Sequence, residues 1–201
     1  MPAFSFPIQP DENRTRIYDL NNAAPLLAGE TLSSVISSTC EKGGVTTLGI
    51  LVSATIDSDG KSLKVRRVAG NEDDVHNITV LLETSGACRI EVDITSVTKT
   101  KYEAPFELQP TEITLRDIEL ANKTELYYLG ETLFGNPSVT MTADDASSTT
   151  GMLKSTTHLG TRAKIRVGQP VDGKAYTIQS LSTTSGSHVI AANLRMLGVA
   201  L

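Results

Sequence analysis

The sequence contains no tryptophan, only three histidines and two cysteines, and 4% of its 201 residues are aromatic. A glycan- or receptor-binding module usually holds its ligand with exposed aromatic side chains, and this sequence has few of them, although that alternative stays open. Both cysteines, Cys40 and Cys88, fall in the first half of the chain. They cannot form a disulfide framework shared by both halves, and we expect two free thiols, with a bridge special to the first half as the alternative.

Long apolar runs and dense basic runs are also missing. No stretch approaches the roughly 20 apolar residues of a membrane helix, and the first residues do not form a signal peptide, so we expect synthesis in a cytoplasm and no membrane partner. The formal net charge is −5, and the nearest basic run is Lys64-Val65-Arg66-Arg67. Nucleic-acid binding requires basic patches, so we predict no nucleic-acid partner.

Residues that could perform chemistry do not cluster in the sequence. His76, His158 and His188 show neither triad nor metal-ligand spacing, and His76 is expected at a half-exposed strand position. The segment 57–60 (Asp-Ser-Asp-Gly) resembles the start of a calcium loop but lacks the later glutamate, which favours a hairpin turn. We therefore predict no catalytic residue, no metal or cofactor site, no small-molecule substrate and no enzymatic activity.

What the chain does contain is a repeat. Gly29-Glu30-Thr31-Leu32 returns as Gly130-Glu131-Thr132-Leu133. Further matches follow in the same order at an offset of about 100 residues: 6–12 with 106–112, Arg16 with Arg116, Leu20 with Leu120, Ile78 with Ile178, 84–86 (Thr-Ser-Gly) with 184–186, and Ile90 with Ile190. The chain therefore reads as two copies of one domain of about 100 residues, a common size for an independent domain.

The repeat predicts a first domain over 1–98 with a short N-terminal arm, a linker over 99–105, and a second domain over 106–201. Four glycines, Gly29, Gly86, Gly130 and Gly186, are predicted to make structural turns. The two glutamates of the repeated motif, Glu30 and Glu131, are interpreted as parts of a folding device rather than as functional carboxylates.

Short strand patterns separated by turn residues fill both copies. We expect strands over 45–52, 63–68, 76–84 and 89–97, and the helix-like segment 191–197 is assigned to a strand because 89–97 alternates strictly. Many short strands with turns every 8–12 residues predict an all-β chain of two tandem immunoglobulin-like (Ig-like) β-sandwiches, related by internal duplication.

Several short motifs resemble those of a known family. Pro10-Asp11-Glu12, Tyr18-Asp19-Leu20, the Gly-Glu-Thr-Leu turn and the Thr-Ser-Gly segment before Arg89 are similar to the Ig-like domains of bacteriophage virion proteins. The resemblance is to the fiber–tail adaptor and neck (head–tail) type. The second copy matches at Pro110, Glu112, 130–133, 176–178 and 184–186.

The resemblance implies a non-enzymatic virion structural protein that bridges neck, tail or fiber components in several copies per particle. Its partners would be other virion proteins, bound through sandwich edges and through the N-terminal arm, where Phe4 and Phe6 are candidate partner-binding residues. The alternatives are a capsid decoration protein on the head and a glycan- or receptor-binding module. Fold alone does not separate them.

Overall fold

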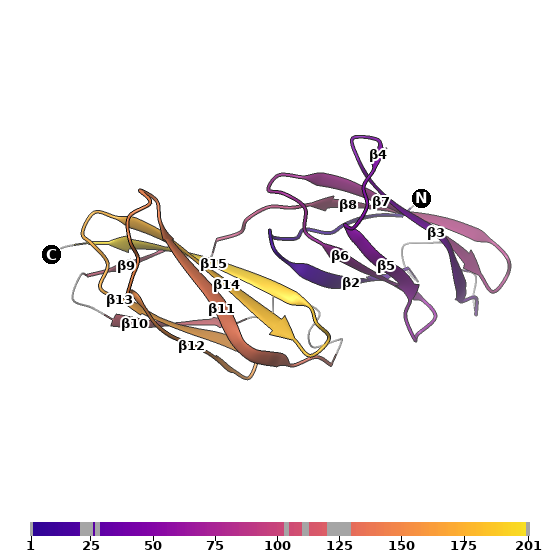
Figure 1. Ribbon diagram of the computed structural model, residues 1–201. Helices are drawn as coiled ribbons and strands as arrows, with labels where there is room; N and C mark the ends of the chain where they lie inside the picture. Colours follow the sequence, from indigo (N-terminus) through magenta and orange to yellow (C-terminus); the bar gives the residue numbers. More distant parts are fainter. Residues whose placement is uncertain are drawn as a thin grey trace. The chain divides into compact units, whose positions relative to one another are not determined.

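The computed structural model describes residues 2–20, 26, 29–102, 105–109, 113–119 and 130–199, with only the backbone for 113, 115 and 117–119. The expected matches at Pro110, Glu112 and Leu120 lie outside these residues. The chain divides into two compact units, Met1–Lys99 (unit 1) and Thr100–Leu201 (unit 2), so the boundary falls within the segment expected to be a linker. Within the described residues, β-strands are the only regular secondary structure (Figure 1).

Unit 1 is built from two sheets. Its strands are β1 (Ala3–Ser5), β2 (Asn13–Asp19), β3 (Leu32–Lys42), β4 (Val45–Thr46), β5 (Leu51–Ile56), β6 (Ser62–Val68), β7 (Val75–Thr84) and β8 (Arg89–Val97). One sheet has the order β1-β8-β7-β3-β4, with β1 parallel to β8 and the other pairs antiparallel. In the second sheet β6 lies between β2 and β5, antiparallel to both.

Unit 2 repeats this arrangement. Its strands are β9 (Phe106–Leu108), β10 (Ile113–Glu119), β11 (Leu133–Ala143), β12 (Leu153–Leu159), β13 (Arg162–Gly168), β14 (Ala175–Thr184) and β15 (Val189–Gly198). One sheet joins β9, β15, β14 and β11, again with a parallel first strand. The other has the order β10-β13-β12.

The strand order identifies the fold. In immunoglobulin domains the second, fifth and fourth principal strands (B, E and D) share one sheet and the third, sixth and seventh (C, F and G) share the other. Unit 1 divides in this way into β2-β6-β5 and β8-β7-β3, and unit 2 into β10-β13-β12 and β15-β14-β11. The chain is therefore all-β with two tandem Ig-like sandwiches, as the sequence predicts, and 191–197 is strand.

Two local predictions need correction. The expected strand over 45–52 is broken, because β4 ends at Thr46 and β5 begins only at Leu51. The intervening Gly49 has a φ of +80°, a left-handed conformation that interrupts a ladder. The expected N-terminal arm is instead partly a strand, since β1 pairs with β8 from Ala3 to Ser5.

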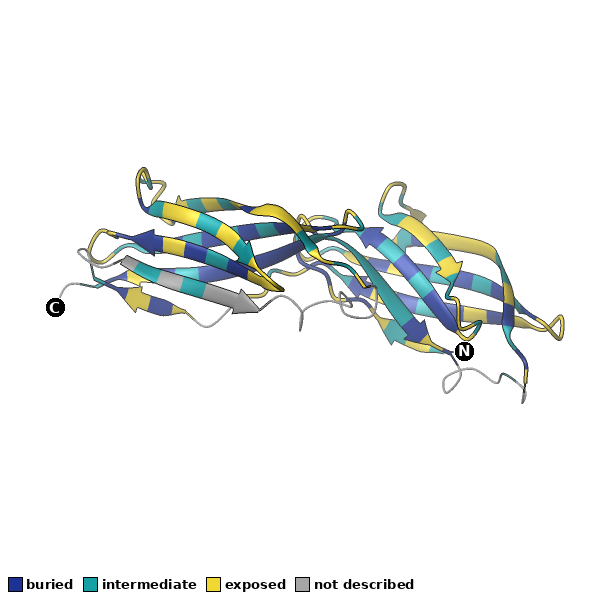
Figure 2. Cartoon of the chain, turned by 90° about the horizontal axis from the view of Figure 1, so that it is seen from below, coloured by how far each residue is buried: buried dark blue, intermediate teal, exposed yellow. Residues whose placement is uncertain are grey.

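Each unit has its own apolar core between its two sheets. In unit 1 inward residues of β2 and β6 pack on those of β7 and β8, and the residues are Tyr18, Leu63, Val65, Ile78, Val80, Leu82, Val92 and Ile94 among others. Unit 2 has the equivalent cluster around Ile165, Ile178 and Leu194. Alternate burial along β7, β8 and β14 follows from the period of two in a strand (Figure 2).

Candidate functional site

In unit 1 the Gly-Glu-Thr-Leu motif (29–32) and the Thr-Ser-Gly segment (84–86), both repeated in the sequence, are joined by hydrogen bonds. The Glu30 carboxylate, whose residue is 9% exposed, accepts a hydrogen bond from the Thr84 hydroxyl. Ser85 ties the same segments together, since its N–H donates to the Thr31 carbonyl at 2.8 Å and its Oγ accepts from the Thr31 N–H at 3.1 Å. A carboxylate this buried is stable only with such partners, which explains why the motifs recur together.

Unit 2 contains the same contacts. The Thr184 hydroxyl donates to Glu131, and Ser185 makes the two matching hydrogen bonds with Thr132, at 2.8 and 3.2 Å. His188 adds one more, with Nδ1 2.7 Å from Glu131 Oε2, at the position that Cys88 occupies in unit 1. Because both units close the β7–β8 or β14–β15 turn in this way, the geometry is that of a folding device.

The four glycines serve this device in two ways. Gly29 and Gly130 have φ values of +84° and +65°, in the left-handed region that favours glycine. Gly86 and Gly186 instead lie against the glutamates. A Cβ on Gly86 would be 2.6 Å from Glu30 Oε1, and one on Gly186 would lie closer still to Glu131.

Phe4 and Phe6, the candidate partner-binding residues, lie in unit 1. The ring of Phe4 is half-buried, with its centroid 4.9 Å from that of Tyr18, and Phe6 is 0% exposed. A role as a partner anchor stays a prediction, and it would require β1 to detach from β8.

A buried polar cluster at one end of the unit 1 core was not anticipated. Arg67 is fully buried, and its guanidinium donates to Ser96 Oγ, to Thr98 Oγ1 at 3.3 Å and to the Val68 carbonyl at 3.1 Å. Ser96 in turn donates to the Phe6 carbonyl at 2.5 Å. Burial lowers the pKa of Arg67, yet an arginine stays charged in proteins.

His76 lies beside this cluster and corrects the sequence-based expectation. It is 1% exposed rather than half-exposed, because it shares the inward face of β7 with Ile78 and Val80. Burial lowers its pKa, and the charge of Arg67 lowers it further, so the ring is neutral at pH 7. Counting the parity of β7 from Ile78 would have placed His76 inside.

The equivalent end of unit 2 is apolar. By strand register the positions of Arg67, His76, Ser96 and Thr98 are taken there by Val167, Tyr176, Met196 and Gly198, all of them buried. Unit 2 has a cation close by on a different strand: the guanidinium of Arg116, on β10, lies 3.7 Å from the centre of the Phe106 ring. The Ig-like fold therefore does not require the polar cluster of unit 1.

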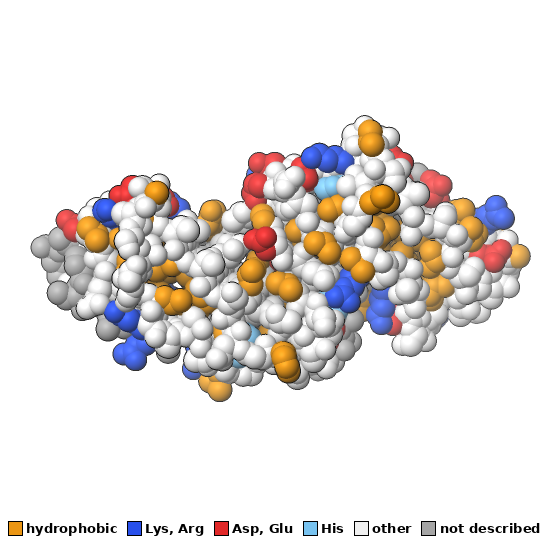
Figure 3. All heavy atoms as spheres, viewed as in Figure 1, with side chains coloured by type: hydrophobic (Ala, Val, Ile, Leu, Met, Phe, Trp, Pro, Cys, Tyr) orange, Lys and Arg blue, Asp and Glu red, His pale blue; other side chains and the backbone are white. Residues whose placement is uncertain are grey.

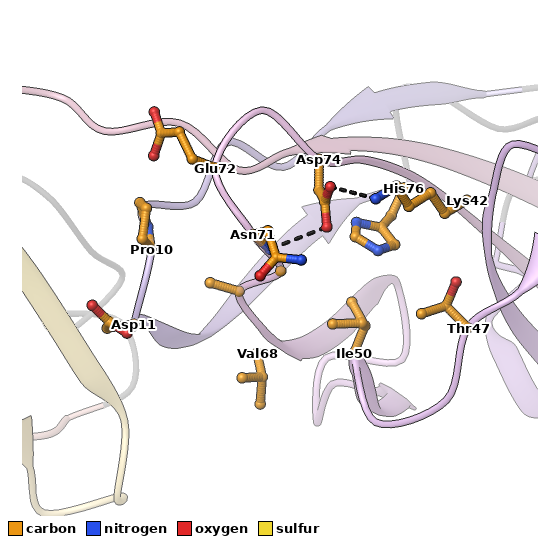
Figure 4. Close-up of a pocket in the computed structure, with 12 residues that line it drawn as sticks. Pro10, Asp11, Lys42, Thr47, Ile50, Val68, Asn71, Glu72, Asp74 and His76 are labelled. Carbon is orange, nitrogen blue, oxygen red and sulfur yellow. Dashed lines mark hydrogen bonds and ion pairs between the residues drawn. The ribbon is translucent and has the colours of Figure 1, made fainter.

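An open pocket of about 680 Å³ adjoins His76 in unit 1. Its wall is formed by the ends of β3 and β6, the start of β7, the 69–74 turn, the segment before β5 and residues 10–11 before β2. The volume is within the range of small-molecule sites. Figure 4 shows the His76 ring between the Lys42–Asp74 pair and the side chains of Ile50 and Thr47.

The other candidate residues serve local structure. His158 on β12 contacts the Gly135 carbonyl through Nδ1 at 2.6 Å and Ser182 Oγ through Nε2 at 3.0 Å. The Asp59 carboxylate accepts hydrogen bonds from the Lys61 and Ser62 N–H groups and from the Ser62 hydroxyl, as in a hairpin turn. Across the described part of the chain, no group of three or more acidic, histidine or cysteine residues could hold a metal ion.

Cys40 and Cys88 are free thiols, the first buried and the second exposed. Burial raises the pKa of Cys40, which keeps it protonated.

Large apolar side chains reach the surface of unit 1 mainly along β3, β4 and β5. These residues are Ile36, Val45, Leu48 and Val52, with exposures from 42% to 89%, and we call them the β3–β5 surface. The one other large apolar residue of this kind among the described residues of unit 1 is Val75. In unit 2, Phe134 of β11 and Leu159 of β12 are exposed on the equivalent strands.

Comparison with known proteins assigns this chain to no family. No protein-family model matches the sequence, and no curated protein matches it. Among solved structures, a chimeric titin Z1Z2 pair has 12% identity and a TM-score of 0.32, covering 100% of this chain and 95% of its own. The Ig1-2 module of the Drosophila receptor protein tyrosine phosphatase DLAR has 12% identity and a TM-score of 0.28, covering 98% and 96%.

At these TM-scores the assignment to tandem Ig-like domains rests on the strand order within each unit. The described residues include no helix that is long and apolar enough to cross a membrane.

Proposed function

We propose that this chain is a non-enzymatic structural protein of a tailed bacteriophage virion, an adaptor that joins neck, tail or fiber components. The β3–β5 surface carries the proposal. Its four apolar side chains lie on β3, β4 and β5 and on the segment between β4 and β5, and all are exposed to solvent, with Leu48 at 89%, so a partner chain can cover them.

The edges of both sheets support the same function. β5 pairs only with β6 and β4 only with β3 among the described residues, so each has an unpaired side. An unpaired strand edge can accept an extended segment of another protein through main-chain hydrogen bonds. The resemblance of the motifs from Pro10-Asp11-Glu12 to the Thr-Ser-Gly segments to those of phage adaptor proteins supports the virion part of the proposal.

The surface charge also suits protein partners. On the face seen in Figure 3, acidic and basic side chains form small separate groups between apolar and uncharged atoms. Phosphate backbones bind to continuous basic patches, so this face offers nucleic acid little.

Immunogold electron microscopy of phage particles from the source locates the protein directly. We expect label at the head–tail junction, on the tail or at the fiber joints. Label distributed over the whole head would replace the adaptor by a decoration protein. Unlabelled particles, with the protein present in the same lysate, would overturn the virion assignment.

Two matched variants test the surface. Leu48→Lys combined with Val52→Lys is expected to abolish incorporation into particles while unit 1 stays folded, because both side chains are already exposed. Val171→Lys, at an exposed valine of unit 2, is the control and should be incorporated normally. Equal incorporation of both variants would contradict the role of this surface.

A further inference from the structure

The pocket beside His76 has the features of a binding site rather than of a gap in packing. Its lining combines apolar side chains, Ile50 and Val68, with charged groups at the rim. The Lys42 ammonium lies 2.5 Å from Asp74 Oδ1, and the Asn71 N–H donates to Asp74 Oδ2 at 3.1 Å. Figure 4 shows these groups on one side of the space and Asp11 and Pro10 across it.

His76 supplies a polar atom without a partner. Its Nδ1 is buried and makes no hydrogen bond in the structure, although a buried imidazole nitrogen normally has one. Leaving such a group without a partner destabilises the folded chain. Because the ring is neutral, Nδ1 can accept a hydrogen bond when Nε2 carries the proton.

The equivalent position of unit 2 carries a larger side chain whose polar atom has a partner. Tyr176 stands at the position of His76, is fully buried, and its hydroxyl accepts a hydrogen bond from the Val171 N–H at 3.0 Å. A larger ring therefore occupies that end of the core and satisfies its own polar atom. In unit 1 the smaller imidazole stands beside an open pocket and keeps an unused acceptor.

The chemistry of the lining favours a cation. Its charged residues are the three carboxylates of Asp11, Glu72 and Asp74 against the one ammonium of Lys42. The positive charge of Arg67 lies behind His76, but its hydrogen bonds run to Ser96, Thr98 and a carbonyl instead of into the pocket. The apolar wall at Ile50 and Val68 suits a methylene stem.

We propose that this pocket binds an alkylammonium or alkylguanidinium group, with the cationic head at Asp74 and His76 and the stem on Ile50 and Val68. The head would compete with Lys42 for Asp74 and, once a shift of the 69–74 turn uncovers the buried Nδ1 of His76, would donate an N–H to it. Such a group is either the side chain of a lysine or arginine in a partner protein or a free aliphatic amine.

Titration of the full ¹⁵N-labelled chain with n-butylguanidinium, n-butylammonium and an end-blocked arginine tetrapeptide tests the proposal. We expect saturable shifts of the Gly70 and Asn71 amide signals and of the His76 ring signals. Tighter binding of the peptide than of butylguanidinium would identify a partner's side chain as the ligand, and the reverse order a free amine. Absence of shifts at millimolar concentrations, or stronger binding of n-butyl phosphate, would overturn the proposal.

Three variants test the proposal further, because they are expected to change the binding affinity in different directions. Asp74→Asn should weaken binding about tenfold, the worth of one charge-assisted hydrogen bond. Lys42→Met should strengthen it several-fold, because the competing ammonium is removed. His76→Tyr should abolish binding by filling the space as in unit 2. His158→Tyr in unit 2 is the control, and if it weakened binding as much as His76→Tyr, the site would lie elsewhere.

Discussion

At the scale of single residues, the two copies keep one polar contact and differ in another. The carboxylate of the Gly-Glu-Thr-Leu motif accepts the hydroxyl of the Thr-Ser-Gly segment in both units. The cluster around Arg67 occurs in unit 1 alone, since unit 2 has Val167 and Met196 at the positions of Arg67 and Ser96. A contact present in both copies is explained by the fold they share, whereas a contact present in one copy requires an explanation specific to that copy.

The shared contact makes a direct prediction. Thr184→Val removes the hydroxyl that donates to Glu131 and that accepts from the His188 N–H at 3.1 Å, while the side-chain shape is kept. We expect unit 2 to lose about 1–3 kcal/mol of unfolding free energy, the cost of unsatisfied buried polar groups. Urea denaturation measures the loss. Thr183→Val, at the exposed neighbouring position, is the control, and equal losses in the two variants would argue against the contact.

Arg67 leads to a contrasting expectation. In the described residues its hydrogen-bond partners are hydroxyls and a carbonyl, with no carboxylate to offset the cost of burying its charge. Arg67→Met, which keeps the volume and removes the charge, should change the unfolding free energy by less than about 1 kcal/mol. Arg67→Ala should cost about 2–4 kcal/mol because it leaves a cavity. Calorimetry compares the two, and a loss in Arg67→Met as large as in Arg67→Ala would show that the hydrogen bonds dominate.

At the scale of elements, the hairpin between β5 and β6 depends on one carboxylate. Asp59 accepts hydrogen bonds from the Ser62 hydroxyl and from the Lys61 and Ser62 N–H groups, and these lower its pKa in the folded chain. Its charged form is thus favoured by folding. The resulting stability is complete above the pKa of the unfolded chain, about 4, and is lost as the pH falls through the lower folded value.

Asp59→Ala is therefore expected to destabilise unit 1 at pH 7, and the gap to the unchanged chain should narrow as the pH falls below about 4. Urea denaturation at a series of pH values measures this gap. Ser58→Ala, in the same turn but outside these hydrogen bonds, serves as the control. A gap that stays constant across this range would show that Asp59 acts without its charge.

At the scale of the whole molecule, each unit encloses its own core. Ile78 and Ile178 occupy equivalent, fully buried positions in the two clusters. Replacing either by alanine should cost its own unit about 2–5 kcal/mol. Hydrogen exchange followed by mass spectrometry should show faster exchange in residues of unit 1 for Ile78→Ala and in residues of unit 2 for Ile178→Ala. If either variant raised exchange equally in both units, the cores would not be independent.

The sequence alone predicts the duplication, the all-β class and the Ig-like sandwich, because strand periodicity and turn residues are local properties that repeat along the chain. It also predicts that Glu30 and Glu131 have a role in folding, since both copies carry the motif. It did not place β1, whose pairing with β8 joins residues about 90 apart in the chain, nor the break at Gly49 within an otherwise continuous β-branched run.

The surroundings of His76 and the exposure of the apolar side chains follow from the three-dimensional fold and not from local sequence. The burial of His76 follows from the parity of β7, but the groups that surround it, Arg67, Asp74 and Ile50, come from three other segments. The exposure of Leu48 and Val52 likewise depends on where β3 and β5 lie against each other. Such properties arise from packing between distant segments, and no local pattern of residues records them.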